Sequence, residues 1–565
     1  ADCENSGLAK FFISFQKNKK GTAARREVMQ TFFNADGFRK NTSEEDEKNI
    51  ILQRIEIAKE NAQGRCEPEK TEEKIMKLEK KYGLFTAICM VVGIVIGSGV
   101  FFKAQNILNT TGGNMTLGIL AWIIGGVIML ICACTFAVMA TKYEKVNGIV
   151  DYAEVTVGKG YAYHVGWFLS LIYYPTLTSV LAWLSARYFG ELFGWGLSSP
   201  EVMTLGCLFL VSSFALNSLA PKLAGKFQVS TTIIKLIPLL LMAVVGTIYG
   251  LCQTTLSYKV IDGKLVKDGA TQMQILINNF KHVGDSGFSI LFAAVVATAF
   301  AYEGWIVATS INAELKNSKK NLPLALNVSK FSLFIPLSII IVLVYVLYYI
   351  GVAGGATIEV LQVGGAPYAF LQIFGDFFGT ILKVFVVVSC LGTLNGLMLG
   401  CTRGLYALAS RDLGPHAKVL KHVDPETNMP TNSSVLGLLL CGIWYAYFYV
   451  ANLSQNASFG FFSFDSSELP IVTTYAFYIP IFVMMIIKER KELGVLKGIV
   501  LPSLSILCCL FMIVAAIYAH GVTPLINALE NGKFSCPIIA YLIVFTIIMI
   551  IGTIFYLRDK KETVN

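Results

Sequence analysis

The stretch Val91-Val92-Gly93-Ile94-Val95-Ile96-Gly97-Ser98-Gly99-Val100-Phe101-Phe102 decides how this chain folds. It lies inside an apolar segment over residues 84–108, which is long enough to cross a bilayer. Glycine costs about 1 kcal/mol relative to alanine in a helix, and serine competes for backbone hydrogen bonds, so Gly97-Ser98-Gly99 continues a helix poorly. A helix that breaks within a membrane leaves unpaired backbone groups, which are tolerated only where they line a cavity. We therefore predict a break that faces a cavity.

The two ends of this break have opposite polarity. The half-helix that starts near Val100 directs its N–H groups and positive dipole end at the cavity, which suits a carboxylate. The half-helix that ends near Ile96 presents free carbonyl groups, which suit an ammonium or another cation. One small zwitterion would satisfy both ends. The alternative is that these glycines only let two membrane helices pack closely.

The composition indicates a helical membrane protein with several spans. Of the 565 residues, 55% are hydrophobic and 15% are charged, whereas soluble domains carry about 25% charged residues. The mean hydropathy is +0.61. We attribute the net charge of +9 to the topology of basic loops, and we expect no nucleic-acid partner. The 13 cysteines show no metal-ligand spacing and the five histidines lie away from the break, so we expect no metal, no cofactor and no enzymatic activity.

Twelve apolar spans follow a polar N-terminal extension over residues 1–80, which we expect to be partly helical. The spans cover approximately residues 84–108, 116–140, 163–189, 201–219, 227–251, 287–312, 331–352, 376–402, 433–451, 468–487, 498–519 and 537–557. With the N-terminus inside, the inward loops hold 17 basic residues and the outward loops hold 5. The excess of basic residues in the inward loops predicts that both termini are cytoplasmic.

A second break is expected in span 6. If residues 81–251 and 252–487 are repeats of five spans each, they have opposite orientations, and residues 488–565 supply the last two spans and a cytoplasmic tail. Span 6 should then break where span 1 does, and it contains Glu303-Gly304 near mid-membrane. A carboxylate buried there costs at least about 2.5 kcal/mol, which makes it a functional candidate. The alternative is a structural pair between Glu303 and another buried group.

Lys235 is the third candidate. It lies eight residues into span 5, roughly 12 Å from the membrane surface at 1.5 Å per residue, which is too deep for its ammonium to reach water comfortably. We expect it to meet carbonyl groups, a carboxylate or water inside the bundle, bridging span 1 to span 8. A purely structural ion pair is the alternative.

At these residues the sequence resembles the amino acid–polyamine–organocation superfamily. More narrowly, it is similar to the L-type amino acid transporter family and its bacterial relatives, which include serine/threonine exchangers. The resemblance covers about residues 80–560 and depends on a combination of short motifs. These are Ile96-Gly97-Ser98-Gly99-Val100-Phe101, Tyr174-Pro175, Lys235, Phe300-Ala301-Tyr302-Glu303-Gly304-Trp305, Glu314, Leu322-Pro323-Leu324-Ala325, Asn395-Gly396, Arg403-Gly404-Leu405-Tyr406-Ala407 and Arg411-Asp412.

The resemblance implies an all-α integral membrane fold of twelve transmembrane helices, arranged as a five-plus-five inverted repeat with helices 1 and 6 broken. It implies that the substrate carboxylate binds at Ser98, Gly99 and Val100, and that the amino group binds carbonyls near Val95, Phe300 and Glu303. Tyr302 and Trp305 would wall or gate the pocket, and Lys235 would replace the sodium ion of other transporters of this build. The candidate substrate-binding residues are Val95, Ile96, Gly97, Ser98, Gly99, Val100, Phe300, Ala301, Tyr302, Glu303 and Trp305.

We therefore expect a sodium-independent amino acid exchanger that works by alternating access in the lipid bilayer of the plasma membrane. Glu303 replaces the small or apolar residue of many family members, and a buried carboxylate favours the ammonium or guanidinium of a dibasic amino acid. The loop over residues 190–200 has no cysteine, so we expect no disulfide to a heavy chain. Two alternatives stay open. One is a proton-coupled symporter in which Glu303 takes up a proton in each cycle, and the other is a transport-inactive sensor that signals through residues 1–80.

Overall fold

This computed structural model describes the chain at Gly93, at Gly97 and over residues 99–143, 148–196, 198–252, 258–261, 264–267, 271–284, 287–304, 334–453, 460–532 and 534–564. The predicted N-terminal extension, residues 1–80, lies outside the described residues. So do most of the first half of predicted span 1 and the second half of predicted span 6.

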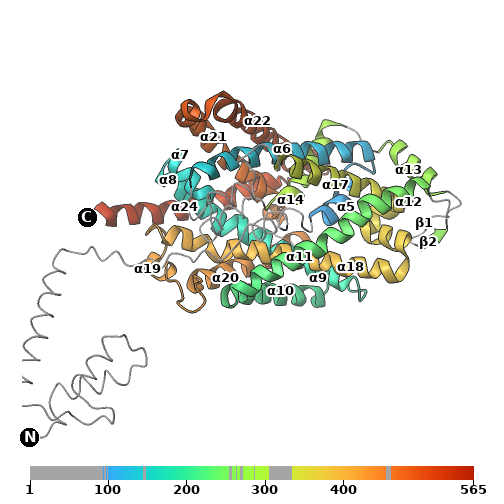
Figure 1. Cartoon of the computed structure of the whole chain (residues 1–565), viewed down its shortest axis with the longest axis horizontal. Coiled ribbons are helices and arrows are strands. Elements are labelled where there is room, and N and C mark those ends of the chain that lie inside the picture. The colour runs from blue at the N-terminus through green and yellow to red at the C-terminus, as the bar shows by residue number, and fades with distance from the viewer. Residues whose placement is uncertain are drawn as a thin grey trace, which may run out of the picture. The chain divides into compact units, whose positions relative to one another are not determined.

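The described residues are helical almost throughout (Figure 1). The helices are α5 (Gly99–Thr110), α6 (Met115–Lys142), α7 (Ile149–Thr156), α8 (Lys159–Phe168), α9 (Tyr174–Gly190), α10 (Pro200–Leu219), α11 (Pro221–Leu241), α12 (Thr247–Cys252), α13 (Gln272–Lys281), α14 (Phe288–Tyr302), α17 (Phe334–Gly355), α18 (Ile358–Ala409), α19 (Ala417–Leu420), α20 (Thr431–Phe448), α21 (Leu469–Val495), α22 (Leu501–Ile517), α23 (Thr523–Glu530) and α24 (Pro537–Val564). Single π-helical turns continue several of them: η2 (Leu169–Tyr173), η3 (Met242–Gly246), η5 (Tyr449–Leu453), η7 (Leu496–Val500) and η8 (Tyr518–Val522). A short 3₁₀ turn, η6 (Gly460–Phe462), precedes α21.

Eight helical stretches of the described chain are long and apolar enough to cross a membrane. The longest, Leu469–Glu530, has 62 residues and would extend about 93 Å if straight, roughly three times the thickness of the hydrocarbon core. Gly494 interrupts it with a φ of 73°, and α21 and α22 pack against each other on the two sides of this turn. α14 and the segment Ile340–Gly355 of α17 are shorter apolar helices. The chain is therefore a multi-pass helical membrane protein.

The predicted all-α fold class is confirmed, and one short β-hairpin is added to it in a loop. Strands β1 (Tyr258–Ile261) and β2 (Lys264–Lys267) pair antiparallel, with Ile261 opposite Lys264. The sequence between them, Asp262-Gly263, is a dipeptide typical of two-residue hairpin loops. This hairpin follows predicted span 5, in a loop predicted to face outward, where no spanning helix is required.

Two short helices, α5 and α14, position the site. α14 packs against α6 and α5, and α18 packs against α5, α9 and α11. Figure 1 shows α5 and α14 near the middle of the view, where both are surrounded by longer helices. The ends of these two short helices are therefore held inside the bundle.

α17 crosses η3 and α12 at very short range because glycines meet there. A Cβ atom on Gly351 would lie 2.0 Å from the Met242 carbonyl oxygen, and one on Gly250 would lie 2.6 Å from the Gly354 Cα atom. Small residues commonly allow membrane helices to approach this closely. Backbone contact therefore fixes the position of α17 against η3 and α12, which continue the helix α11 that carries Lys235.

The change Gly351→Ala should lower the apparent melting temperature of the purified protein in detergent. The added methyl group must push α17 away from η3, and overpacking of this kind costs about 1–3 kcal/mol. Gly442→Ala in α20 is the matched control, because a Cβ atom there meets no atom within 4 Å. Thermal denaturation of both variants measures the difference, and equal stability would contradict the close crossing.

Candidate functional site

The described residues leave the helical conformation at both positions where a break is predicted. Gly93 is helical, Gly97 lies in a bend, and α5 begins at Gly99. α14 ends at Tyr302, after which Glu303 is extended and Gly304 has a φ of 102°. Only glycine adopts such a positive φ readily, so Gly304 allows the chain to leave the helix axis.

The two breaks meet backbone to backbone. A Cβ atom on Gly99 would lie 2.4 Å from the Cα atom of Ala301, closer than non-bonded carbon atoms can approach. Glycine at position 99 is therefore required for the N-terminal end of α5 to lie against the last turn of α14. The N–H groups of the first turn of α5 and the end of α14 consequently face the same space.

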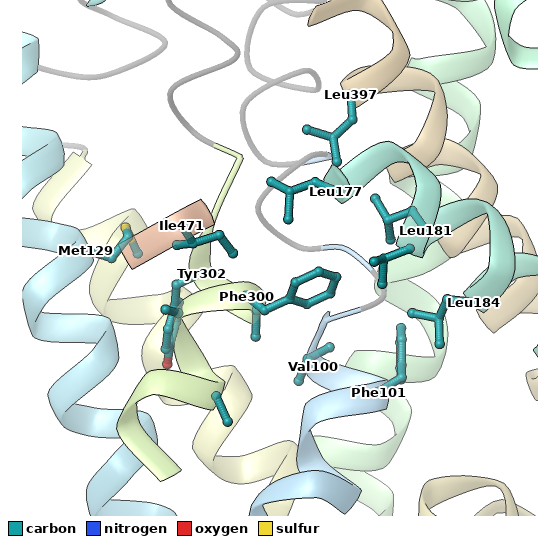
Figure 2. Close-up of a cluster of buried hydrophobic side chains, with 14 of the residues drawn as sticks. Val100, Phe101, Met129, Leu177, Leu181, Leu184, Phe300, Tyr302, Leu397 and Ile471 are labelled. Atoms are coloured by element: carbon teal, nitrogen blue, oxygen red, sulfur yellow. The ribbon is translucent and has the colours of Figure 1, made fainter. Parts of the chain in front are cut away.

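That space is a cavity of about 330 Å³. It is lined by Gly97, Gly99, Leu177, Leu181, Phe300, Glu303, Gly304, Thr393, Leu397 and Ile471. Figure 2 shows Phe300 extending from α14 toward Leu181, with Leu177 and Leu397 above it and Val100 below it. The cavity walls are mostly apolar with a few polar groups, a composition typical of small-molecule sites.

Glu303 provides the acidic group of the cavity wall. The residue is 5% exposed, and the Tyr173 hydroxyl donates a hydrogen bond of 2.5 Å to its Oε1 atom. Tyr173 ends the π-helical turn η2 between α8 and α9, where one extra residue per turn changes the direction of the side chains. This hydrogen bond orients the carboxyl group in the cavity wall.

Lys235 lies on the other side of the first break. It is fully buried in α11, and its ammonium donates to the Gly93 carbonyl and lies 3.4 Å from the Thr393 hydroxyl of α18. These are the two elements, span 1 and span 8, that the sequence analysis expected Lys235 to bridge. Thr393 also lines the cavity, so the ammonium is one side chain away from it.

The structure distributes the sequence-predicted site residues unevenly. Gly97, Gly99, Phe300 and Glu303 line the cavity. Val100 is fully buried in the apolar core beside it, and Ala301 supplies the backbone that contacts Gly99. The candidates outside the described residues are Val95, Ile96, Ser98 and Trp305.

Tyr302 occupies a different place from the one predicted. Its hydroxyl donates to the Trp122 carbonyl of α6 at 2.9 Å, and its ring stacks on Tyr345 at 5.1 Å. Figure 2 shows its ring directed away from Leu177 and Leu397. Successive residues of a helix are about 100° apart around its axis, so Phe300 and Tyr302, two residues apart, point to nearly opposite sides. Tyr302 therefore faces α6 when Phe300 faces the cavity. In the described structure it holds α14 in position and is absent from the cavity wall.

An ionic cluster lies on the α5 side of the cavity. The Lys103 ammonium, 1% exposed, is 2.5 Å from the Glu468 Oε1 atom, and the His520 Nε2 atom is 3.0 Å from Oε2 of the same carboxylate. Lys103 is one turn into α5, Glu468 immediately precedes α21, and His520 lies in η8. The same ammonium lies 5.2 Å from the centre of the Phe300 ring. The cluster therefore connects the cavity wall to two further helices.

Four residues near the cavity were not predicted from the sequence: Tyr173, Lys103, Glu468 and His520. Lys103 carried a usable signal, because an ionisable residue inside an apolar span is a functional candidate by the same rule that selected Lys235. All five histidines were expected to lie away from the breaks, whereas His520 is only two contacts away from α5. Tyr173 carried no such signal, since its direction depends on a π-helical turn that the sequence does not reveal.

The change Glu468→Gln should destabilise the protein by about 3–5 kcal/mol, because it leaves the Lys103 ammonium buried without its counter-ion. Glu492→Gln is the matched control, since Glu492 pairs with Lys142 at a position where its side chain is 69% exposed. The melting temperature in detergent should fall steeply for Glu468→Gln and barely change for Glu492→Gln. Equal melting temperatures would show that the cluster does not hold α5.

Comparison with known proteins agrees with this architecture. A family model described as amino acid permease matches residues 82–549. The chain is similar to a serine/threonine exchanger of Bacillus subtilis, with 29% identity over 427 residues that cover 75% of this chain and 87% of the exchanger. It is also similar to the human b(0,+)-type amino acid transporter 1, with 26% identity over 464 residues, 79% of this chain and 84% of that protein. The human cystine/glutamate transporter is 26% identical over 363 residues, 63% of this chain and 66% of that protein.

The matched region contains every helix described above except the last turns of α24. The family resemblance that the sequence motifs predicted is therefore confirmed, and the expectation of a transport protein instead of an enzyme is confirmed with it. The chain belongs to the amino acid permease family of the amino acid–polyamine–organocation superfamily.

Proposed function

We propose that this chain exchanges amino acids across the plasma membrane by alternating access. The family model is that of an amino acid permease, and the similar proteins include a serine/threonine exchanger and a b(0,+)-type amino acid transporter. The observation that carries the proposal is the cavity where the two broken helices meet, which is lined by Gly97, Gly99 and Glu303.

The polarity of the two breaks suits the common part of every amino acid. The substrate carboxylate binds the N–H groups at the start of α5, at Ser98, Gly99 and Val100, where the helix dipole is positive. The amino group binds carbonyls near Val95, Phe300 and Glu303. Leu177, Leu181, Leu397 and Ile471 then exclude water from around the substrate.

The topology follows the sequence pattern. Twelve spans form two inverted repeats, residues 81–251 and 252–487, and residues 488–565 add the last two spans and a cytoplasmic tail. The break at Gly97 and the break at Gly304 fall in the corresponding first spans of the two repeats, which supports this division. The excess of basic residues in the inward loops supports cytoplasmic termini.

Transport is independent of sodium. The Lys235 ammonium contacts the Gly93 carbonyl and the Thr393 hydroxyl, two oxygen ligands of the kind that a sodium ion would take. A fixed positive charge at this point joins span 1 to α18 without a bound ion. The protein consequently needs no sodium gradient to assemble its binding site.

Glu303 gives the site a preference for dibasic amino acids. Its carboxyl group lines a largely apolar cavity, where it accepts hydrogen bonds from the Tyr173 hydroxyl and from the Gly304 backbone. A substrate ammonium or guanidinium reaching Glu303 gives this buried carboxylate an ion-pair partner. A neutral substrate gains no such contact.

Proton-coupled symport is the second candidate function. It is favoured by the 5% exposure of Glu303, because an apolar environment favours the neutral carboxyl group. In that mechanism Glu303 carries one proton inward per cycle, and net uptake needs no internal amino acid.

Flux through reconstituted liposomes distinguishes these functions. Liposomes in sodium-free choline buffer are loaded with unlabelled lysine, unlabelled serine or nothing, and uptake of labelled lysine and labelled serine is measured. Wild type should require internal amino acid and no sodium. Glu303→Gln should lose about 10–100-fold of its lysine uptake, the value of one charge-assisted hydrogen bond, and retain serine uptake.

Glu359→Gln is the matched control, because Glu359 is exposed in the first turn of α18, and it should transport both amino acids like wild type. If empty liposomes accumulate labelled amino acid under a proton gradient, the exchange proposal is wrong and the protein is a proton-coupled symporter. Loss of lysine and serine uptake together in Glu303→Gln would assign Glu303 to coupling or structure instead of selectivity.

A further inference from the structure

A short helix, α13, lies in the loop between predicted spans 5 and 6. It begins with a capping box, in which the side chain of Thr271 accepts from the Gln274 N–H and the side chain of Gln274 accepts from the Thr271 N–H. Its 10 residues extend about 15 Å, half of the hydrocarbon thickness, so α13 is too short to cross a bilayer. Figure 1 shows it beside α12, at the end of the molecule that carries β1 and β2. The helix therefore lies where the spans meet the membrane surface.

The side chains of α13 divide into three faces around the helix axis. The face buried against the bundle consists of Ile275, Leu276 and Asn279. The polar face is exposed and consists of Gln274, Asn278 and Lys281. The apolar face is also exposed and consists of Met273 at 49% exposure and of Ile277 and Phe280 at 39% each. At about 100° per residue the centres of these faces lie roughly 110–140° apart, so the apolar face is turned away from both the protein and the polar face.

Hydrogen bonds to two other elements hold α13 at one rotation. Asn279 donates through its Nδ2 atom to the carbonyl groups of Ala353 and Ala356, at 2.8 and 2.9 Å, at the C-terminal end of α17. The His282 Nε2 atom donates to the Gly112 carbonyl at 2.9 Å, in the turn that follows α5. The apolar face of α13 therefore has a fixed direction relative to the bundle.

The apolar face continues the lipid-facing surface of the neighbouring span. α13 packs against α12, which is the last part of the apolar stretch Pro221–Cys252. Ile248 and Leu251 of α12 are exposed, as expected for side chains that contact acyl chains. Leu251 lies in the last turn of α12, at the end of the span from which the chain leads to α13. Lipid that surrounds α12 consequently reaches the level of α13.

A protein partner fits the apolar face less well than lipid does. Three side chains that are less than half exposed supply at most about 300 Å², whereas a stable protein interface buries roughly 800 Å² per partner. An apolar face beside a polar face that ends in an exposed lysine is the pattern of helices that lie in the plane of a membrane interface.

We propose that α13 binds the lipid bilayer as an interfacial helix, with its apolar face among the acyl chains and its polar face among the headgroups and water. Helices of this kind bury their apolar face about 5–10 Å into the boundary between headgroups and acyl chains. In the proposed topology this is the outer leaflet. The inference goes beyond the proposed transport function and requires only the membrane-spanning fold. Through His282 and Gly112, α13 also connects the bilayer surface to the turn after α5, the outer half of the first broken helix.

Fluorescence quenching of an added tryptophan locates each face of α13. The full chain and its variants are reconstituted in phosphatidylcholine liposomes, and the emission of the six native tryptophans is measured in wild type and subtracted. One set of liposomes carries bromine on the acyl chains near the headgroup, a second carries it near the terminal methyl group, and a third has no bromine but contains iodide in the water on both sides. Ile248→Trp in α12 serves as the reference for a side chain that contacts lipid.

Ile277→Trp should lose its added emission to bromine near the headgroup, lose less to bromine near the methyl group, and keep it in iodide. Asn278→Trp is the matched control, because it is the next residue and lies on the polar face. It should lose its added emission to iodide and keep it in both brominated lipids. If Ile277→Trp does not fold, Phe280→Trp, on the same apolar face, decides.

Two results would overturn the lipid contact. Equal quenching of Ile277→Trp and Asn278→Trp by iodide would place the apolar face in water. Protection of Ile277→Trp from iodide and from both brominated lipids would show that protein covers the face, as in contact with a second copy of the chain. Neither result bears on amino acid exchange, which the flux measurement tests separately.

Discussion

The contact between Gly99 and Ala301 is the constraint on which the rest of the site depends. It brings the start of α5 against the end of α14, with a virtual Cβ distance of 2.4 Å that only glycine permits. The start of α5 and the end of α14 therefore lie at one cavity, where a ligand can contact both. Any larger side chain at position 99 would push the start of α5 away from the end of α14.

Charged side chains surround this crossing and stabilise its parts separately. Lys235 holds the inner part of span 1 through the Gly93 carbonyl, and Lys103 holds α5 through Glu468. Glu303, oriented by Tyr173, is the charge that faces the cavity. In our proposal the first two groups set the geometry of the binding site, and the third selects among side chains.

The sequence predicted the bend at Gly97, the end of α14 before Glu303 and the contacts of Lys235, because these depend on residue type and depth alone. Glycine pairs and single charges within apolar spans are strong signals, since each is costly unless it has a partner. The β-hairpin was not predicted although Asp262-Gly263 is a hairpin signal, because the pattern of apolar spans carries no information about loops outside the membrane. Pairings between distant segments could not be predicted, such as Tyr173 with Glu303, 130 residues apart, or Lys103 with Glu468, 365 apart. These pairings depend on how each helix is rotated about its axis, which the pattern of spans does not determine. For the same reason Tyr302 was expected at the cavity, whereas it faces α6.

A structure determined with saturating lysine tests the central claim most directly. The account predicts lysine in the cavity between the broken helices, with its carboxylate at the N-terminal end of α5 and its side-chain ammonium at Glu303. Lysine bound away from this cavity, or bound there with its carboxylate facing Glu303, would contradict the assignment of the two breaks to the two ends of the substrate.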